Sequence, residues 1–290
     1  MGAEALLGGR YRLDHVAGHG GMATVFAAYD TVLDRPVAIK LLARRRDETG
    51  VIQERFEREA RAEAKIVHPN VVSVHDIGEA DDGRPYIVMD FVQGRSLQEF
   101  IAEDGPLSSE RVAIMGMGIA RALAAAHLLG IIHRDVKPAN VIIDPQGIPH
   151  VMDFGLAREL YGADPALTAP GVLVGTAYYV APEQARYGTA SPATDLYALG
   201  AVLYHALTGE PPFTGEGALD VALRRFEEDP EDVRARVPAA DADLTVLIHA
   251  LLARDPAERP WDAAAVAERL GDIGARLRAT RTAGESQAPL

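Results

Sequence analysis

Residues 133–140 read HRDVKPAN, and residues 151–155 read VMDFG. Both stretches follow apolar segments, and they carry four side chains suited to phosphate or metal chemistry: Asp135, Lys137, Asn140 and Asp153. Asp135 can accept a hydroxyl proton, and Lys137 can neutralise a phosphoryl group in transfer. Asn140 and Asp153 offer the oxygen ligands that Mg²⁺ or Mn²⁺ prefers. The pair of stretches therefore predicts a phosphoryl-transfer centre that uses a divalent metal.

A glycine-rich loop precedes this centre, between two predicted strands near the N-terminus. It contains Gly18, His19, Gly20 and Gly21. Glycines allow backbone N–H groups to approach phosphate oxygens closely, although ordinary hairpins carry similar clusters. The following residues, 24–29, are β-branched and aromatic, which argues against a dinucleotide-binding loop because that loop opens a helix. The loop by itself leaves two alternatives open, an ordinary hairpin and a phosphate-binding hairpin.

A lysine lies inside the next apolar strand, residues 37–42. Lys40 has apolar neighbours, so it must either find an anion or lie on an exposed strand face. A predicted helix over residues 51–67 supplies Glu59 and Glu63 on a similar face. A Lys40–glutamate pair would hold the ammonium against the phosphates of a nucleotide.

The predicted secondary structure changes near residue 94. Strand-like segments, with one helix, occupy residues 11–92, and helical periodicity dominates afterwards. The predicted helices are residues 109–129, 193–208, 218–227, 243–253 and 262–278. We predict an α+β, bilobal fold, with a small sheet-rich lobe at 10–92, a larger helical lobe at 93–278, a cleft near 90–94 and a disordered polar tail at 279–290.

Composition excludes several classes of protein. The formal net charge of the 290 residues is -13, which argues against nucleic acid as a main partner. There is no cysteine, so disulfides and thiolate sites are excluded. No apolar run reaches the roughly 18–20 residues that a membrane span needs, and the N-terminus lacks a signal-peptide pattern. We expect a cytoplasmic protein with no membrane segment in this chain.

The motifs, in this order, resemble those of the protein kinases. Ala181-Pro182-Glu183, the helix from Thr194 and Arg259 extend the resemblance over residues 11–277. The sequence is similar in detail to the bacterial Hanks-type Ser/Thr kinases, with Gly-Gly-Met in the first loop and Gly-Thr-Ala-Tyr-Tyr before Ala-Pro-Glu. It departs from the usual pattern at Ala23, where a third glycine is expected.

The resemblance implies ATP and Mg²⁺ (or Mn²⁺) as cofactors and Ser/Thr residues of proteins as acceptors. The implied catalytic residues are Asp135, Lys137, Lys40 and Glu59, with Asn140 and Asp153 as metal ligands. The implied ATP site comprises Gly18, His19, Gly20, Gly21, Val25, Ala38, Lys40, Met89, Asp90, Val92, Asn140 and Asp153. Glu63 falls where relatives place an apolar residue behind Phe154, so either the register of the helix differs or the helix sits loosely in an inactive state.

The resemblance also implies how the domain is held and controlled. Asp195 should brace the loop around Asp135, and Glu183 should pair with Arg259. Thr176 should bond to the catalytic Asp and Lys, and Thr168 is the expected regulatory phosphosite. Two alternatives are an ATP-binding scaffold without turnover and a small-molecule phosphotransferase. Autophosphorylation within a homodimer is a further possibility.

Overall fold

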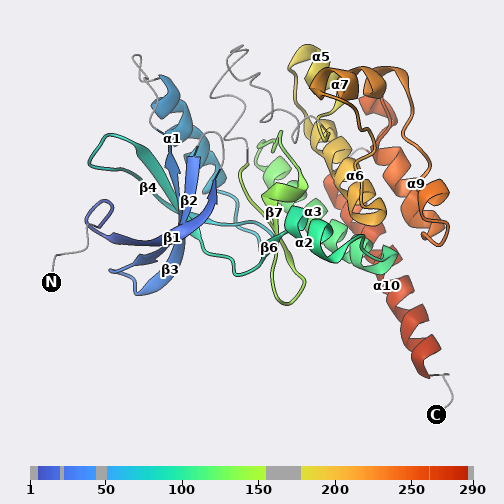
Figure 1. The fold of residues 1–290 in the computed structure, drawn as a ribbon, viewed down its shortest axis with the longest axis horizontal. Helices are drawn as coiled ribbons and strands as arrows, with labels where there is room; N and C mark the ends of the chain where they lie inside the picture. The colour runs from blue at the N-terminus through green and yellow to red at the C-terminus, as the bar shows by residue number, and fades with distance from the viewer. Residues whose placement is uncertain (1–5, 20–22, 44–50, 155–177, 261, 287–290) are drawn as a thin grey trace.

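The computed structural model describes residues 6–19, 23–43, 51–154, 178–260 and 262–286. Figure 1 shows an N-terminal sheet with one long helix beside a larger, mainly helical part, with the two chain ends at opposite ends of the molecule. This is the predicted α+β arrangement of two lobes. Thr168, Thr176, Gly20 and Gly21 lie outside the described residues.

The small lobe is built on a five-stranded sheet with the order β1-β2-β3-β5-β4. Its neighbouring strands are all antiparallel: β1 (Tyr11–His19), β2 (Ala23–Asp30), β3 (Arg35–Leu42), β4 (Val74–Glu79) and β5 (Pro85–Asp90). The turn between β2 and β3 is held by Asp30, whose carboxylate accepts the N–H groups of Val32 and Leu33. Helix α1 (Val51–Glu63) buries Phe56 and Ala60 against this sheet.

The large lobe carries the other helices that the structure describes and a small second sheet. The helices are α2 (Leu97–Asp104), α3 (Ser109–Leu128), α5 (Pro182–Tyr187), α6 (Pro192–Thr208), α7 (Ala218–Glu227), α8 (Val233–Arg236), α9 (Ala242–Leu251) and α10 (Ala263–Ser286). Short 3-10 helices occupy Pro138–Asn140 and Pro256–Glu258. The sheet is β6 (Arg95–Ser96), β7 (Val141–Ile143) and β8 (Pro149–Val151), in that order.

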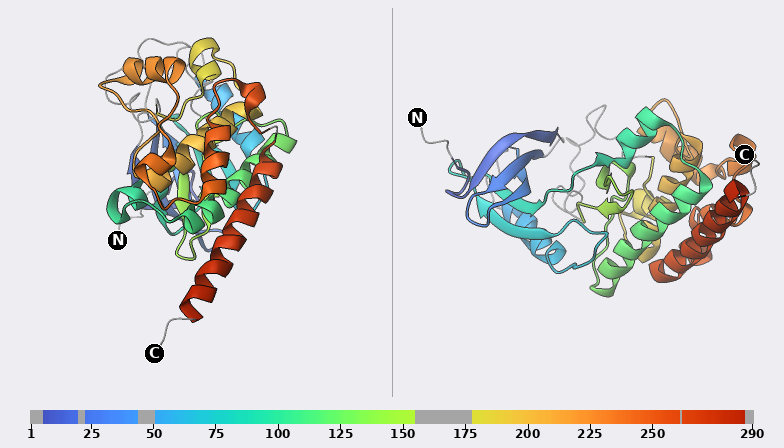
Figure 2. Two further views of the ribbon diagram at one scale, coloured as in Figure 1. Left: turned by 90° about the vertical axis from the view of Figure 1, so that its right-hand side faces the viewer. Right: turned by 90° about the horizontal axis from the view of Figure 1, so that it is seen from below.

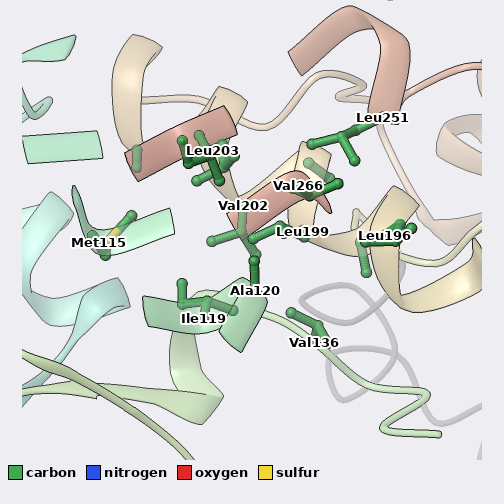
Figure 3. Close-up of a cluster of buried hydrophobic side chains, with 14 of the residues drawn as sticks. Met115, Ile119, Ala120, Val136, Leu196, Leu199, Val202, Leu203, Leu251 and Val266 are labelled. Carbon is green, nitrogen blue, oxygen red and sulfur yellow. The ribbon is translucent and has the colours of Figure 1, made fainter. Parts of the chain in front are cut away.

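Helix α3 forms the centre of the large lobe, where it packs against α6 and α10 (Figure 3). Its first turn is capped by Ser108, and Gly130 follows it with a φ of 72°. By length and composition α3 is the one described helix that could cross a membrane, but 56% of its most apolar window is buried in the protein. Gly200 lets α6 approach α9 closely, because a Cβ there would lie 2.7 Å from Cβ of Leu251.

Two backbone connections between the lobes lie within the described residues. One is the chain itself, residues 91–94, between β5 and β6. The other is a set of hydrogen bonds to β8: the Val72 N–H donates to the Val151 carbonyl at 2.9 Å, and the Val151 N–H donates to the Asn70 carbonyl at 2.8 Å. The Asn70 side chain adds a bond to the Pro149 carbonyl at 2.8 Å.

The C-terminal segment differs from the prediction. Residues 279–286 were predicted to be disordered, but α10 continues to Ser286 and projects from the large lobe (Figure 2). Its extension is tied to α3, because Arg278 and Arg281 bind Glu110 at 3.4 and 2.9 Å. Glu110, which lies 171 positions before Arg281 in the sequence, stabilises the end of α10. The prediction of disorder was wrong because it used only the local polarity of this segment.

Candidate active site

The loop that carries Asp135 is held from below by Asp195, in the first turn of α6. The completely buried Asp195 carboxylate accepts the N–H groups of His133 and Arg134, each at 2.8 Å. Arg134 has a φ of 68°, a left-handed conformation that costs about 1–3 kcal/mol for a residue other than glycine. The bond from its N–H to Asp195 holds it there, and the expected brace is present.

Asp135 is bound by two neighbours from the same loop. Lys137 Nζ lies 2.6 Å from Asp135 Oδ2, and Asn140 Nδ2 donates to the same oxygen at 3.2 Å and to the Asp135 carbonyl at 2.8 Å. Among the described residues, both side-chain bonds use Oδ2, so Oδ1 can accept a proton. The Asn140 amide nitrogen is committed to Asp135, which leaves its oxygen for a metal ion.

Asp153 follows β8 and binds Lys40 across the cleft. The distance from Lys40 Nζ to Asp153 Oδ1 is 2.7 Å, and the two side chains are 14% and 20% exposed. The φ of Asp153 is 66°, which turns this residue away from the strand direction. Strand β3 places Lys40 between Val25 of β2 and Ile87 of β5, so the lysine lies inside the sheet as the sequence predicted.

The predicted Lys40–Glu59 pair is not the pair found here. In the described part of the chain the ion-pair partner of Lys40 is Asp153, because the backbone turn at Asp153 brings its carboxylate within reach of the ammonium. The carboxylate oxygens of Glu59 are buried, so the residue faces inward from α1 as expected. The nucleotide-side ion pair therefore uses a different carboxylate from the one predicted.

Glu63 is also buried, with 4% of the residue exposed. Its Oε1 accepts the Phe154 N–H at 3.3 Å. Glu59 and Glu63 thus both face inward from α1, as the sequence predicted. Burial raises the pKa of Glu63 to about 8, the charge of Asp153 adds to this rise, and Lys40 opposes it.

The residues expected around a purine form one apolar cluster. Ala38 and Met89 face each other across β3 and β5, and Val25 and Val92 pack against the same cluster. The Asp90 carboxylate instead points at β4, where it bonds to His75 at 2.6 Å and to the Ser73 N–H at 3.2 Å. Burial alone would raise the pKa of Asp90, but these bonds outweigh it and lower the pKa. The Asp90 side chain is therefore occupied, and this residue can form hydrogen bonds to a purine base only through its backbone.

The start of the phosphate-binding hairpin is described through the end of β1. Gly18 pairs with Val25, and the backbone of His19 pairs with Thr24. The predicted positions of Gly20 and Gly21 against a phosphate lie outside the described residues.

Comparison with known proteins decides the family. Residues 11–269 match the family model described as the protein kinase domain. The chain belongs to the protein kinase family.

Several relatives of the kinase are bacterial. It is 42% identical over 271 residues to the probable serine/threonine-protein kinase PknB of Corynebacterium glutamicum, and this match covers 91% of the chain and 42% of that relative. It is 40% identical over 253 residues to serine/threonine-protein kinase PrkC of Bacillus subtilis, with 87% and 39% covered. The chain thus spans less than half the length of these relatives. The solved kinase domain of Mycobacterium tuberculosis PknI is similar at a TM-score of 0.72 and 26% identity, covering 94% of this chain and 99% of that one.

Beyond the catalytic loop, the kinase carries the expected buried ion pair. Arg259 donates to both oxygens of Glu183, at 2.8 and 2.9 Å, and its side chain is completely buried. Burial alone would raise the pKa of Glu183, but the hydrogen bonds from Arg259 outweigh it and lower the pKa. The pair anchors the start of α5 to the segment before α10.

Two supporting residues of the kinase were missed from the sequence. His127 Nε2 lies 2.8 Å from Asp195 Oδ2, and Gln184 donates to the Arg134 carbonyl at 2.9 Å. Both bind the frame of the catalytic loop. His127 is a largely buried polar residue near the end of the mainly apolar helix α3, and Gln184 directly follows Glu183. A search for polar residues within apolar segments would have found the first.

Proposed function

We propose that this kinase domain transfers the γ-phosphate of ATP to Ser and Thr hydroxyls of protein substrates. The observation that carries the proposal is Asp135, whose Oδ2 is held by Lys137 and Asn140 while its backbone frame is fixed by Asp195. The printed names of PknB and PrkC, which are serine/threonine-protein kinases, support the acceptor class. Lys137, two residues after Asp135, fits the same class.

In this mechanism each residue acts on a stated atom. Asp135 Oδ1 receives the proton of the substrate hydroxyl as that oxygen bonds to the γ-phosphorus and the bond to the β-phosphate oxygen breaks. Lys137 stays beside Asp135 Oδ2 and offsets the negative charge of the moving group. Val25, Ala38 and Met89 exclude water from the purine, and the backbone of residues 90–92 supplies its hydrogen bonds.

The residues at the cleft fit a divalent cation. Asn140 and Asp153 provide a carboxamide and a carboxylate oxygen, and Mg²⁺ or Mn²⁺ usually takes one or two such protein ligands with phosphate oxygens and water. When bound, the metal offsets the charge of the phosphates. Lys40 pairs with Asp153 in this structure. With ATP present it would bind the α- and β-phosphates.

Regulation of the kinase and its location in the cell are two further parts of the proposal. Thr168 is the proposed autophosphorylation site, with Arg134 as the partner of its phosphate. Transfer between two copies of the chain would explain how the first phosphate is added. We place the domain in the cytoplasm, where ATP is available and a chain without cysteine loses nothing to reduction.

The test is to incubate the purified protein with ATP and Mg²⁺ and to locate phosphate by intact and peptide mass spectrometry. Asp135→Asn removes the proton acceptor and should lower the rate about 10²–10⁴-fold, while nucleotide binding by thermal shift persists. Lys40→Met is a second inactive control. Binding without any phosphate transfer in the wild type would favour the ATP-binding scaffold, and no binding at all would contradict the whole proposal.

A further inference from the structure

Glu63 occupies an unusual place for a carboxyl group. It is the last residue of α1 and is almost completely buried. A buried carboxyl loses its hydration, and the C-terminal end of a helix carries partial negative charge, so both effects oppose an ionised side chain there. Such a group persists in a fold only where donors compensate it.

The compensating donor comes from the backbone beside Asp153. The Phe154 N–H donates to Glu63 Oε1 at 3.3 Å. The ladder of β8 has ended at this point, since its last pair joins Val141 and Val151. Phe154 is buried, so its N–H needs an acceptor within the protein.

Asp153 therefore lies between two fixed neighbours. On one side the Met152 N–H donates to the Asn140 carbonyl at 3.0 Å, and on the other the Phe154 N–H donates to Glu63. Between them Asp153 keeps a left-handed φ of 66°. A left-handed conformation in a residue other than glycine persists where its surroundings hold it, and Glu63 provides one of the two holds.

We propose that Glu63 is a positioning residue for Asp153: its carboxyl ties the backbone of residues 153–154 to α1, so the helix and the metal-binding aspartate are placed together. An apolar side chain at residue 63 could pack against Phe154 but could not accept the Phe154 N–H. The link would act on the backbone of residues 153–154. Packing between side chains alone would not fix the backbone conformation of Asp153. The expected effect of Glu63 on metal binding rests on the proposed kinase function. Its effect on the backbone of residues 153–154 does not.

The substitutions follow from the chemistry of the site. Glu63→Leu removes the acceptor, and Glu63→Gln keeps a carbonyl oxygen with nearly the same shape. Because the Phe154 N–H needs only an acceptor oxygen at this place, a neutral amide is a close replacement. Glu63→Met is a second apolar variant, since methionine adapts to irregular spaces and guards against misfolding of the leucine variant. Glu57→Leu is the matched control, on the same helix but partly exposed and paired with Arg61.

The first experiment needs no nucleotide. Hydrogen exchange measured by mass spectrometry should show the amides of residues 153–154 exchanging about tenfold faster in Glu63→Leu and Glu63→Met, because one hydrogen bond is lost. Glu63→Gln should stay near the wild-type rate, and Glu57→Leu should not change it. Equal protection in the wild type and both apolar variants would overturn the proposal.

The second experiment measures the affinity for ADP with Mg²⁺ and with EDTA. The apolar variants should need about tenfold more Mg²⁺ for half-maximal binding, while binding in EDTA stays unchanged and Glu63→Gln largely restores the wild-type value. A merely structural defect would weaken both conditions alike and would contradict the inference. A wild type that binds no nucleotide would sink the proposed function instead, and the exchange experiment would still decide the role of Glu63.

Discussion

Two groups of buried charge lie on either side of Asp135, and they are built differently. Below the catalytic loop, Arg259 matches Glu183 with two bonds, and Asp195 is surrounded by N–H donors. On the nucleotide side, Lys40 pairs with Asp153, and the neighbouring Glu63 is held toward its neutral form by burial. In the lower group the carboxylates of Glu183 and Asp195 are closed in by several donors, whereas the upper group depends on one partly exposed ion pair.

The difference matches what each side must do. Asp135 needs a fixed position, so its supports are saturated with hydrogen bonds that hold one geometry. In the proposed function Lys40 would exchange Asp153 for phosphates, and an ammonium held by a single carboxylate can do so without breaking a bidentate pair. The rigid group and the exchangeable group thus lie on opposite sides of the loop that carries Asp135.

Breaking the lower group should have the largest effect on stability. Arg259→Met keeps most of the side-chain volume but leaves the Glu183 carboxylate buried without its partner, which should cost about 3–5 kcal/mol in urea denaturation. Adding Glu183→Gln to Arg259→Met should recover part of the loss. A cost below about 1 kcal/mol for Arg259→Met would show that the pair is not a structural anchor.

Breaking the upper group should cost less. Lys40→Met removes one partly exposed ion pair, for which we expect a loss of about 1–2 kcal/mol by the same denaturation measurement, although ATP binding weakens strongly. The comparison with Arg259→Met is internal to one protein and one assay. Equal losses for the two variants would contradict the contrast between a closed and an exchangeable group.

The smallest effect concerns pH. The folded state holds the pKa of Glu183 below its ordinary value of 4.5, so its contribution to stability is complete above that pH and is lost as pH falls through the lowered pKa. The difference in unfolding free energy between the wild type and Glu183→Gln should therefore be constant near neutrality and shrink below pH 4.5. A difference that stays constant on acidification would show that the ionised form is not the one that Arg259 binds.

The sequence predicted the parts of the site that lie close together along the chain. Asp135, Lys137 and Asn140 share one loop, so their meeting depends on few backbone angles, and the burial of Lys40 followed from its apolar strand. The elements with strong periodicity were also found, including the helix at 218–227, which is α7. Short elements such as α2 and α5 carry too few residues to show a period and were missed.

Choices between distant partners were not predictable. Lys40 had Glu59, Glu63 and Asp153 within possible reach, and in the structure it meets Asp153, whose backbone has a left-handed φ of 66°. The end of α10 depends on Glu110, whose position is known only after α3 and α10 pack together. The role of Glu63 was visible as an anomaly in the pattern, but its partner, a backbone N–H 91 positions away, has no signature in sequence.

The double connection between the lobes has a mechanical consequence. A rigid body attached to another at two points keeps one rotation, about the line through those points. Here the points are residues 91–94 and the bonds of Asn70 and Val72 to Val151. Opening of the cleft is then a rotation about that line, and it has to break or carry with it the Lys40–Asp153 ion pair and the hydrogen bond from the Phe154 N–H to Glu63.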